Sequence, residues 1–133
     1  MMRAMKLRML PIAIVVLAAV AAACSSSGSG STGSAAPPPT APPGGAAIVA
    51  QDLKFDRAAL TLPAGAAAPL VFDNRDGAPH NVSISKSDGS KVFTGDTFSG
   101  PSTKTYEVPA LTAGSYGFQC DVHPDMKGTL TVS

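Results

Sequence analysis

The sequence has few of the side chains that usually carry chemistry. Its 133 residues include no tryptophan, only two cysteines and two histidines, and 14% charged residues. Two cysteines exclude a scaffold held together by several disulfides. A formal net charge of +1 is too small for the basic surface that nucleic-acid binding requires. The length allows one ordinary domain, so the positions of the few reactive residues matter more than their number.

The N-terminal segment, positions 1–23, has the pattern of an export signal. Arg3, Lys6 and Arg8 precede an apolar run over positions 10–23, which is shorter than the ~20 residues of a membrane-spanning helix. Small residues then lead to Cys24. This ending resembles the lipobox of bacterial lipoproteins, which implies that a lipid on Cys24 anchors the chain at the extracytoplasmic face of the cell membrane. The alternative is ordinary signal-peptidase cleavage, which would give a periplasmic or secreted protein.

Residues 24–45 are predicted to form a tether. They are rich in serine, glycine and proline and contain no large apolar residue, so they cannot build a core. We expect a disordered linker that is flexible in its first half and more extended in its proline-rich second half. Loss of the signal leaves seven basic residues against nine acidic ones, a net charge of about −2. The single folded domain is predicted to span residues 46–133.

The predicted domain shows period-two alternation in several short segments and no convincing helical periodicity. The residues expected to face inward are Leu60, Leu62, His80, Val82, Ile84, Tyr106, Val108, Tyr116, Phe118, Cys120, Leu130 and Val132, and the segment Leu70, Val71 and Phe72 is expected to form a short apolar strand. Asn81, Ser83 and Ser85 are expected on the opposite face of the strand that begins at His80. Glycine and proline separate these segments, and the pattern predicts an all-β fold, an antiparallel sandwich or barrel.

The only cysteine of the predicted domain, one of its two histidines and its only methionine fall within seven positions: Cys120, His123 and Met126. The alternation points Cys120 inward at a strand end and puts the other two on the following loop. His80 begins another inward-facing strand far upstream in the domain, and a strand end and a loop at the same pole can converge. A thiolate, two imidazoles and a weak thioether form the donor set of a blue-copper centre, whereas zinc would be expected to prefer a site without a thioether. The pattern therefore predicts a site for one copper ion.

This group of residues resembles the cupredoxin family, and the Cys-x₂-His-x₂-Met spacing is closest to its amicyanin-like members. Plastocyanin-like members are similar but carry a longer loop between the second histidine and the methionine. The resemblance covers residues 46–133 and implies a Greek-key β-sandwich or barrel of about seven or eight strands. The ligands it implies are His80, Cys120 and His123 in the equatorial plane and Met126 on the axis. It also implies that Asn81 joins the two ligand loops through hydrogen bonds, which tune the metal as well as hold it.

The resemblance further implies a docking surface for a redox partner near the exposed edge of His123. The residues expected there are Ala78, Pro79, Pro124 and Asp125, with Val122 beside them. Asp125 and Val122 depart from the amicyanin pattern, which has a large apolar residue and a proline at these positions. A carboxylate at this place is expected to lower the reduction potential and to alter the choice of partner.

Other catalytic arrangements are excluded by the same inventory. The domain has no Cys-x-x-Cys pair, no phosphate-binding glycine loop and too few histidines for a multicopper oxidase. Cys120 and His123 are too close along a strand end for a protease-like pair. We expect a monomeric, membrane-tethered carrier of single electrons through Cu(I) and Cu(II), with membrane-associated redox partners, and not an enzyme. The alternatives are an extracytoplasmic copper-buffering protein and a surface-adhesion sandwich without a metal.

Overall fold

The computed structural model describes residues 36–133, so the predicted signal peptide, Cys24 and most of the predicted tether lie outside the described residues. Within the described range the chain forms eleven strands. Their bounds are β1 Ala46–Gln51, β2 Lys54–Phe55, β3 Ala59–Leu62, β4 Ala68–Asn74, β5 Pro79–His80, β6 Ser83–Ser85, β7 Lys91–Thr94, β8 Phe98–Ser99, β9 Ser102–Val108, β10 Gly114–Gln119 and β11 Lys127–Val132. Eight of them have three or more residues, which agrees with the expected seven or eight strands. No helix in this part of the chain has the length and hydropathy needed to cross a membrane.

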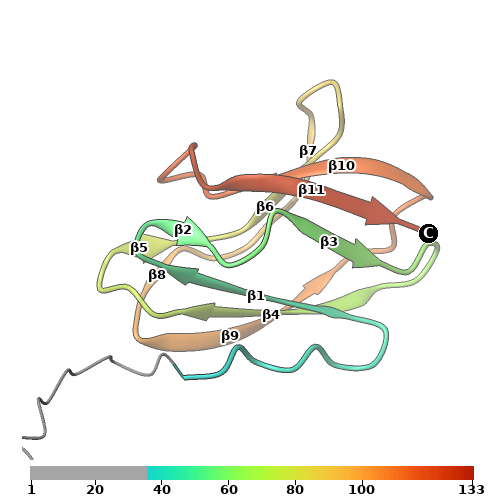
Figure 1. The fold of residues 1–133 in the computed structure, drawn as a ribbon. Coiled ribbons are helices and arrows are strands. Elements are labelled where there is room, and N and C mark those ends of the chain that lie inside the picture. The colour runs from blue at the N-terminus through green and yellow to red at the C-terminus, as the bar shows by residue number, and fades with distance from the viewer. Residues whose placement is uncertain (1–35) are drawn as a thin grey trace, which may run out of the picture. The chain divides into compact units, whose positions relative to one another are not determined.

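Two larger sheets enclose the core (Figure 1). Their strand orders are β2-β1-β4-β9 and β3-β11-β10-β6-β7, while β5 and β8 form a separate short ladder. Buried side chains from both sheets form one cluster. Phe55 lies between the sheets, with its ring centroid 6.3 Å from that of Phe72 on β4 and 5.6 Å from that of Phe118 on β10. The predicted all-β sandwich is confirmed.

The prediction of purely antiparallel pairing is wrong. β1 runs parallel to β4, with Ala46 opposite Leu70, and β3 runs parallel to β11, with Leu60 opposite Leu130. β3 lies between β1 and β4 in the sequence but belongs to the other sheet, so the chain crosses the sandwich before it returns. Alternation of polar and apolar residues reports which face of a strand is buried and not which way the strand runs, so the sequence pattern did not contain this information.

The strand predicted to run from His80 to Ser85 is interrupted. β5 ends at His80 and β6 begins at Ser83, and Asn81 and Ser83 are each only 1% exposed. Both side chains turn toward the loop after β10, where Asn81 Oδ1 accepts the Asp121 N–H at 2.8 Å and the Ser83 hydroxyl donates to Asp121 Oδ1 at 2.9 Å. The outward placement predicted for Asn81 and Ser83 is therefore wrong, because hydrogen bonds rather than apolar contacts bury them.

The last residues of the predicted tether lie against the domain. The Arg75 guanidinium donates to the carbonyl oxygens of Ala36 and Pro37, at 2.7 Å for the latter. The Gly45 N–H donates to the Pro42 carbonyl at 3.0 Å. The segment contains no strand, and β1 begins at residue 46, where the folded domain is predicted to begin. The division into signal, tether and domain stays a prediction.

The hairpin turn between β1 and β2 carries backbone strain. Asp52 and Leu53 have left-handed φ values of 54° and 57°, in a two-residue turn where asparagine and glycine are usual. Such a backbone costs an L-residue roughly 1–2 kcal/mol, and the Leu53 side chain is 54% exposed. We expect Leu53→Gly to raise the free energy of unfolding in urea by about 0.5–1 kcal/mol. Leu53→Ala removes the same apolar surface but keeps the strain, and an equal gain in both variants would show that strain is not the cause.

Candidate metal centre

The loop after β10 is closed by its own backbone. The Cys120 N–H donates to the Met126 carbonyl, and the Met126 N–H donates to the His123 carbonyl, both at 2.9 Å. Cys120 is fully buried and Met126 is 3% exposed, whereas His123 is half-buried. The loop thus fixes the thiol against the core and leaves an edge of one imidazole near the surface.

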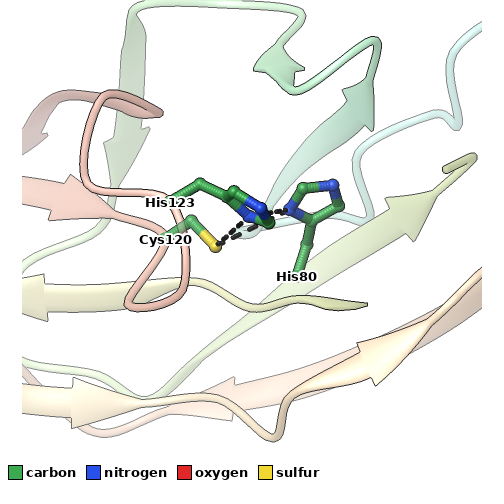
Figure 2. Close-up of side chains that lie close together, drawn as sticks. All are labelled: His80, Cys120 and His123. Carbon is green, nitrogen blue, oxygen red and sulfur yellow. Dashed lines mark hydrogen bonds between the residues drawn. The ribbon is translucent and has the colours of Figure 1, made fainter. Parts of the chain in front are cut away.

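His80 reaches the same place from β5 (Figure 2). Its ring is fully buried, and its Nδ1 atom lies 3.7 Å from Cys120 Sγ and 3.0 Å from His123 Nδ1. The third side of this triangle, from Cys120 Sγ to His123 Nδ1, measures 3.9 Å. Two segments that are distant in the sequence therefore bring three donor atoms together, as the sequence predicted.

The triangle fits one transition-metal ion. In a zinc site the metal lies about 2.0 Å from nitrogen and about 2.3 Å from sulfur, so donors to an ion of this size lie at most roughly 4.1–4.3 Å apart. The three observed distances, 3.0, 3.7 and 3.9 Å, meet that limit. Lone pairs turned toward one point repel each other unless a proton or a cation lies among them. Thiolate and imidazole together are donors that copper and zinc accept.

Met126 completes the set of four predicted ligand residues at this end of the sandwich. Its side chain belongs to the buried cluster that also contains Cys120, and its backbone is bonded to both Cys120 and His123. Among residues 36–133, His80, Cys120 and His123 form the one group of three or more titratable side chains whose donor atoms converge in this way. The role of each residue as a ligand stays a prediction.

Asn81 joins the His80 segment to the Cys120 loop. Its Nδ2 donates to Asp121 Oδ2 at 3.0 Å and to the Gly95 carbonyl at 3.1 Å, while its Oδ1 accepts the Asp121 N–H. These bonds connect the residue after one predicted ligand with the residue after another. Asn81 thus links the two segments by hydrogen bonds, and its role in supporting a metal stays a prediction.

Asp121 supports the site through its carboxylate, a role that the sequence did not predict. It accepts hydrogen bonds from Asn81, from the Ser83 hydroxyl and from Lys91 Nζ, the last at 2.6 Å. Burial alone would raise the pKa of Asp121, but these three donors and the Lys91 charge together hold that pKa below its ordinary value. Asp121 is therefore charged at neutral pH. Its hydrogen bonds hold in place the backbone that directly follows Cys120. In the sequence, Asp121 could be noticed only because it follows Cys120, and that position does not predict its hydrogen bonds to Asn81, Ser83 and Lys91.

A second missed carboxylate, Asp76, contacts His80 directly. Its Oδ2 lies 3.0 Å from His80 Nε2, the ring nitrogen that faces away from Cys120. Burial opposes its ionisation, but the N–H groups of Leu53 and Asp52, together with His80, hold the pKa of Asp76 below its ordinary value. Asp76 precedes His80 by four positions in a loop, where sequence spacing does not predict direction.

The residues predicted to form the docking surface are close to the site in sequence and accessible to different degrees. Pro79, Pro124 and Asp125 are exposed and Ala78 is half-buried. Val122 is 45% exposed, one of two large apolar residues in the described range with so much free surface. Docking at these residues stays a prediction.

The fold and the site define a β-sandwich metalloprotein with sulfur and imidazole donors at one end. The model of the cupredoxin-like domain family matches residues 12–132. Plastocyanin A/B of Petroselinum crispum is 31% identical over 88 residues, which cover 61% of this chain and 89% of that protein. Plastocyanin of Scenedesmus fuscus is 29% identical over 87 residues, which cover 60% and 87%.

Solved structures share the fold. Auracyanin from Roseiflexus castenholzii superposes with a TM-score of 0.60 at 21% identity, over 71% of this chain and 99% of that one. Amicyanin from Paracoccus versutus superposes with a TM-score of 0.53 at 23% identity, over 69% and 84%. The chain belongs to the cupredoxin-like domain family. Its cofactor is one copper ion, which the donor set in this structure fits.

Proposed function

We propose that this protein is an extracytoplasmic, membrane-tethered type 1 copper protein that carries single electrons. In this proposal His80, Cys120 and His123 are the equatorial ligands and Met126 is the axial ligand. The observation that carries the proposal is the convergence of one buried thiol and two imidazole nitrogens within 4.8 Å of one another. When bound, copper supplies the Cu(I)/Cu(II) couple.

The chain's contribution is to hold the same donors in the same places in both oxidation states. Cys120 and Met126 are linked through the backbone of their loop, and Asn81 links that loop to the His80 segment. Ligands that are fixed before and after electron transfer need little rearrangement, and small rearrangement makes the transfer fast. The buried donors Cys120 and His80 also keep water away from one side of the centre.

Electrons are proposed to pass through the half-buried edge of His123. Pro79, Pro124 and Val122 would give a redox partner an apolar contact around it, and Asp125 would add a charge. Since the tether would keep the domain near a membrane, the partners are proposed to be membrane-associated proteins. In this proposal the protein carries electrons and does not catalyse a reaction of its own. The folded domain is proposed to act as a monomer.

Addition of Cu(II) to the metal-free full chain tests the proposal. One equivalent should bind and give an intense blue colour through charge transfer from the Cys120 thiolate, and voltammetry should show a reversible one-electron couple. Copper uptake without reversible cycling would favour the copper-buffering alternative. A chain that takes up no Cu(II) would contradict both functions and would leave the metal-free adhesion alternative.

The tether is tested separately at Cys24. We expect Cys24→Ala to move the protein from the membrane fraction to the soluble extracytoplasmic fraction, because the lipid would have no attachment site. The blue colour should not change, since residues 46–133 are predicted to fold and bind copper without the lipid. Membrane association that survives this substitution would favour another anchor.

Asp125→Asn should raise the reduction potential. An exposed unit charge roughly 8 Å from an ion in water-like surroundings shifts a one-electron potential by about 20 mV, and the exposed Asp125 carboxylate favours the more positive Cu(II) state. We also expect a changed rate of electron exchange with a membrane partner. Glu107→Gln, which removes the same charge from β9, is the control. A shift no larger than that of the control, with no change in partner rate, would contradict the role assigned to Asp125.

A further inference from the structure

The Asp76 carboxylate has three hydrogen-bond contacts to its two oxygens. Its Oδ1 accepts the Asp52 N–H at 2.8 Å, and its Oδ2 accepts the Leu53 N–H at 3.0 Å. The same Oδ2 lies 3.0 Å from His80 Nε2. The Asp76 backbone is held as well, because its N–H donates to Asn74 Oδ1 at 3.0 Å and its carbonyl accepts the Gly100 N–H at 2.9 Å. This side chain is therefore fixed in place before any ligand is considered.

The strained turn supplies the two backbone donors. Consecutive left-handed residues point successive N–H groups to the same side, which forms a small anion-binding concavity. Asp52 and Leu53 have this conformation, and the anion in their concavity is the Asp76 carboxylate. Strained backbone persists where its surroundings over-determine it and often marks a functional constraint. Here the strained turn holds a carboxylate against His80.

The carboxylate decides which nitrogen of His80 carries the proton. A neutral imidazole has one N–H and one lone pair, and only an N–H at Nε2 can donate to Asp76. The lone pair is then at Nδ1, which faces Cys120 Sγ and His123 Nδ1. The opposite tautomer would place a lone pair against the carboxylate and a proton among the three donors.

We propose that Asp76 is a positioning residue for His80, and that the Asp52–Leu53 turn anchors it. Asp76 selects the His80 tautomer, orients the ring and raises the donor strength of Nδ1. The inference rests on the proposed function only in that His80 Nδ1 is taken as a copper ligand. A negative charge hydrogen-bonded to a ligand imidazole favours Cu(II) over Cu(I), so Asp76 lowers the reduction potential.

Two measurements on the full chain test the proposal, with Asp76→Asn as the variant. In the metal-free wild type, long-range ¹H–¹⁵N correlation at mildly alkaline pH should show His80 protonated at Nε2 alone. In Asp76→Asn we expect a mixture of tautomers and a loss of Cu(II) affinity of about tenfold or more, as is typical when a ligand's hydrogen-bond partner is removed. If Cu(I) affinity is unchanged, a tenfold loss raises the potential by about 59 mV.

Asp73→Asn is the matched control. Asp73 carries the same charge three positions earlier and bonds Arg75 at 2.8 Å and Thr103 at 3.0 Å. We expect it to leave the His80 tautomer and the Cu(II) affinity as in the wild type.

Wild-type His80 protonated at Nδ1 or present as a mixture would overturn the proposal, and this result needs no variant to fold. Equal effects of Asp76→Asn and Asp73→Asn on tautomer and affinity would also overturn it. A wild type that shows the Nε2 tautomer, loses it in Asp76→Asn and yet gives no blue copper complex would confirm the positioning role and refute the proposed function.

Discussion

Cys120→Ala is expected to abolish the blue colour completely. Charge transfer to Cu(II) needs a thiolate, and Cys120 is the cysteine that lies within 4 Å of both imidazole nitrogens. The variant should still fold, because alanine fills much of the fully buried site of Cys120 and small core deletions cost about 1 kcal/mol. The two imidazoles of His80 and His123 remain, so we still expect weak Cu(II) binding, with a pale colour. Titration with Cu(II), followed by visible absorption and circular dichroism, measures both.

Met126→Leu is the matched control in the same loop. Leucine and methionine have similar volumes, and such exchanges usually cost less than about 1.5 kcal/mol. The thiolate stays, so the blue colour should stay as well, while loss of the axial thioether should raise the reduction potential because Cu(II) loses a donor. A blue Cys120→Ala variant would refute the assignment of the thiolate. A Met126→Leu variant with an unchanged potential would show that Met126 does not coordinate.

The sequence predicted the parts of this protein that scarcity and periodicity encode. Within residues 46–133 Cys120 is the only cysteine, Met126 the only methionine and His123 one of two histidines, and the three fall within seven positions, so they were visible together. The inward direction of Cys120 followed from alternation with Tyr116 and Phe118, and all three are buried. His80 was harder to place, because a long stretch of chain separates it from Cys120; alternation showed that it faces inward and allowed it to converge with the Cys120 loop, and the resemblance to a known family supported that placement.

The parts that escaped prediction depend on how loops are arranged. Asp76 and Asp121 look like ordinary surface carboxylates in the sequence, and their roles come from donors on segments that are distant along the chain. The inward turn of Asn81 follows from the break between β5 and β6, which alternation cannot reveal. Hydrogen bonds between loops are directional and non-periodic, so they leave no regular pattern in a single sequence.

Asn81→Ala is expected to have the largest effect on stability among the residues around the site. It removes three hydrogen bonds at once, to Asp121 Oδ2, the Asp121 N–H and the Gly95 carbonyl. Asn81 is 1% exposed, so water cannot easily replace it. A buried polar group left without a partner costs about 1–3 kcal/mol, and we expect the free energy of unfolding of the metal-free chain to fall by about 2–4 kcal/mol. Urea denaturation of the metal-free protein measures this loss.

Asn81→Ala should also weaken the hold on copper. This effect would distinguish a residue that positions the ligand segments from one that only stabilises the fold. Without Asn81 the His80 segment and the Cys120 loop lose the two hydrogen bonds between Asn81 and Asp121 and keep the one from the Ser83 hydroxyl to Asp121, so Cu(II) should dissociate faster and the blue band should broaden. Tyr116→Phe is the control: its hydroxyl donates to the Thr112 carbonyl at 2.9 Å, near the start of β10 and away from Cys120. It should cost about 1 kcal/mol and leave the band and the copper dissociation rate unchanged. If Asn81→Ala lowers stability but matches Tyr116→Phe in both copper readouts, Asn81 supports the fold without positioning the ligands.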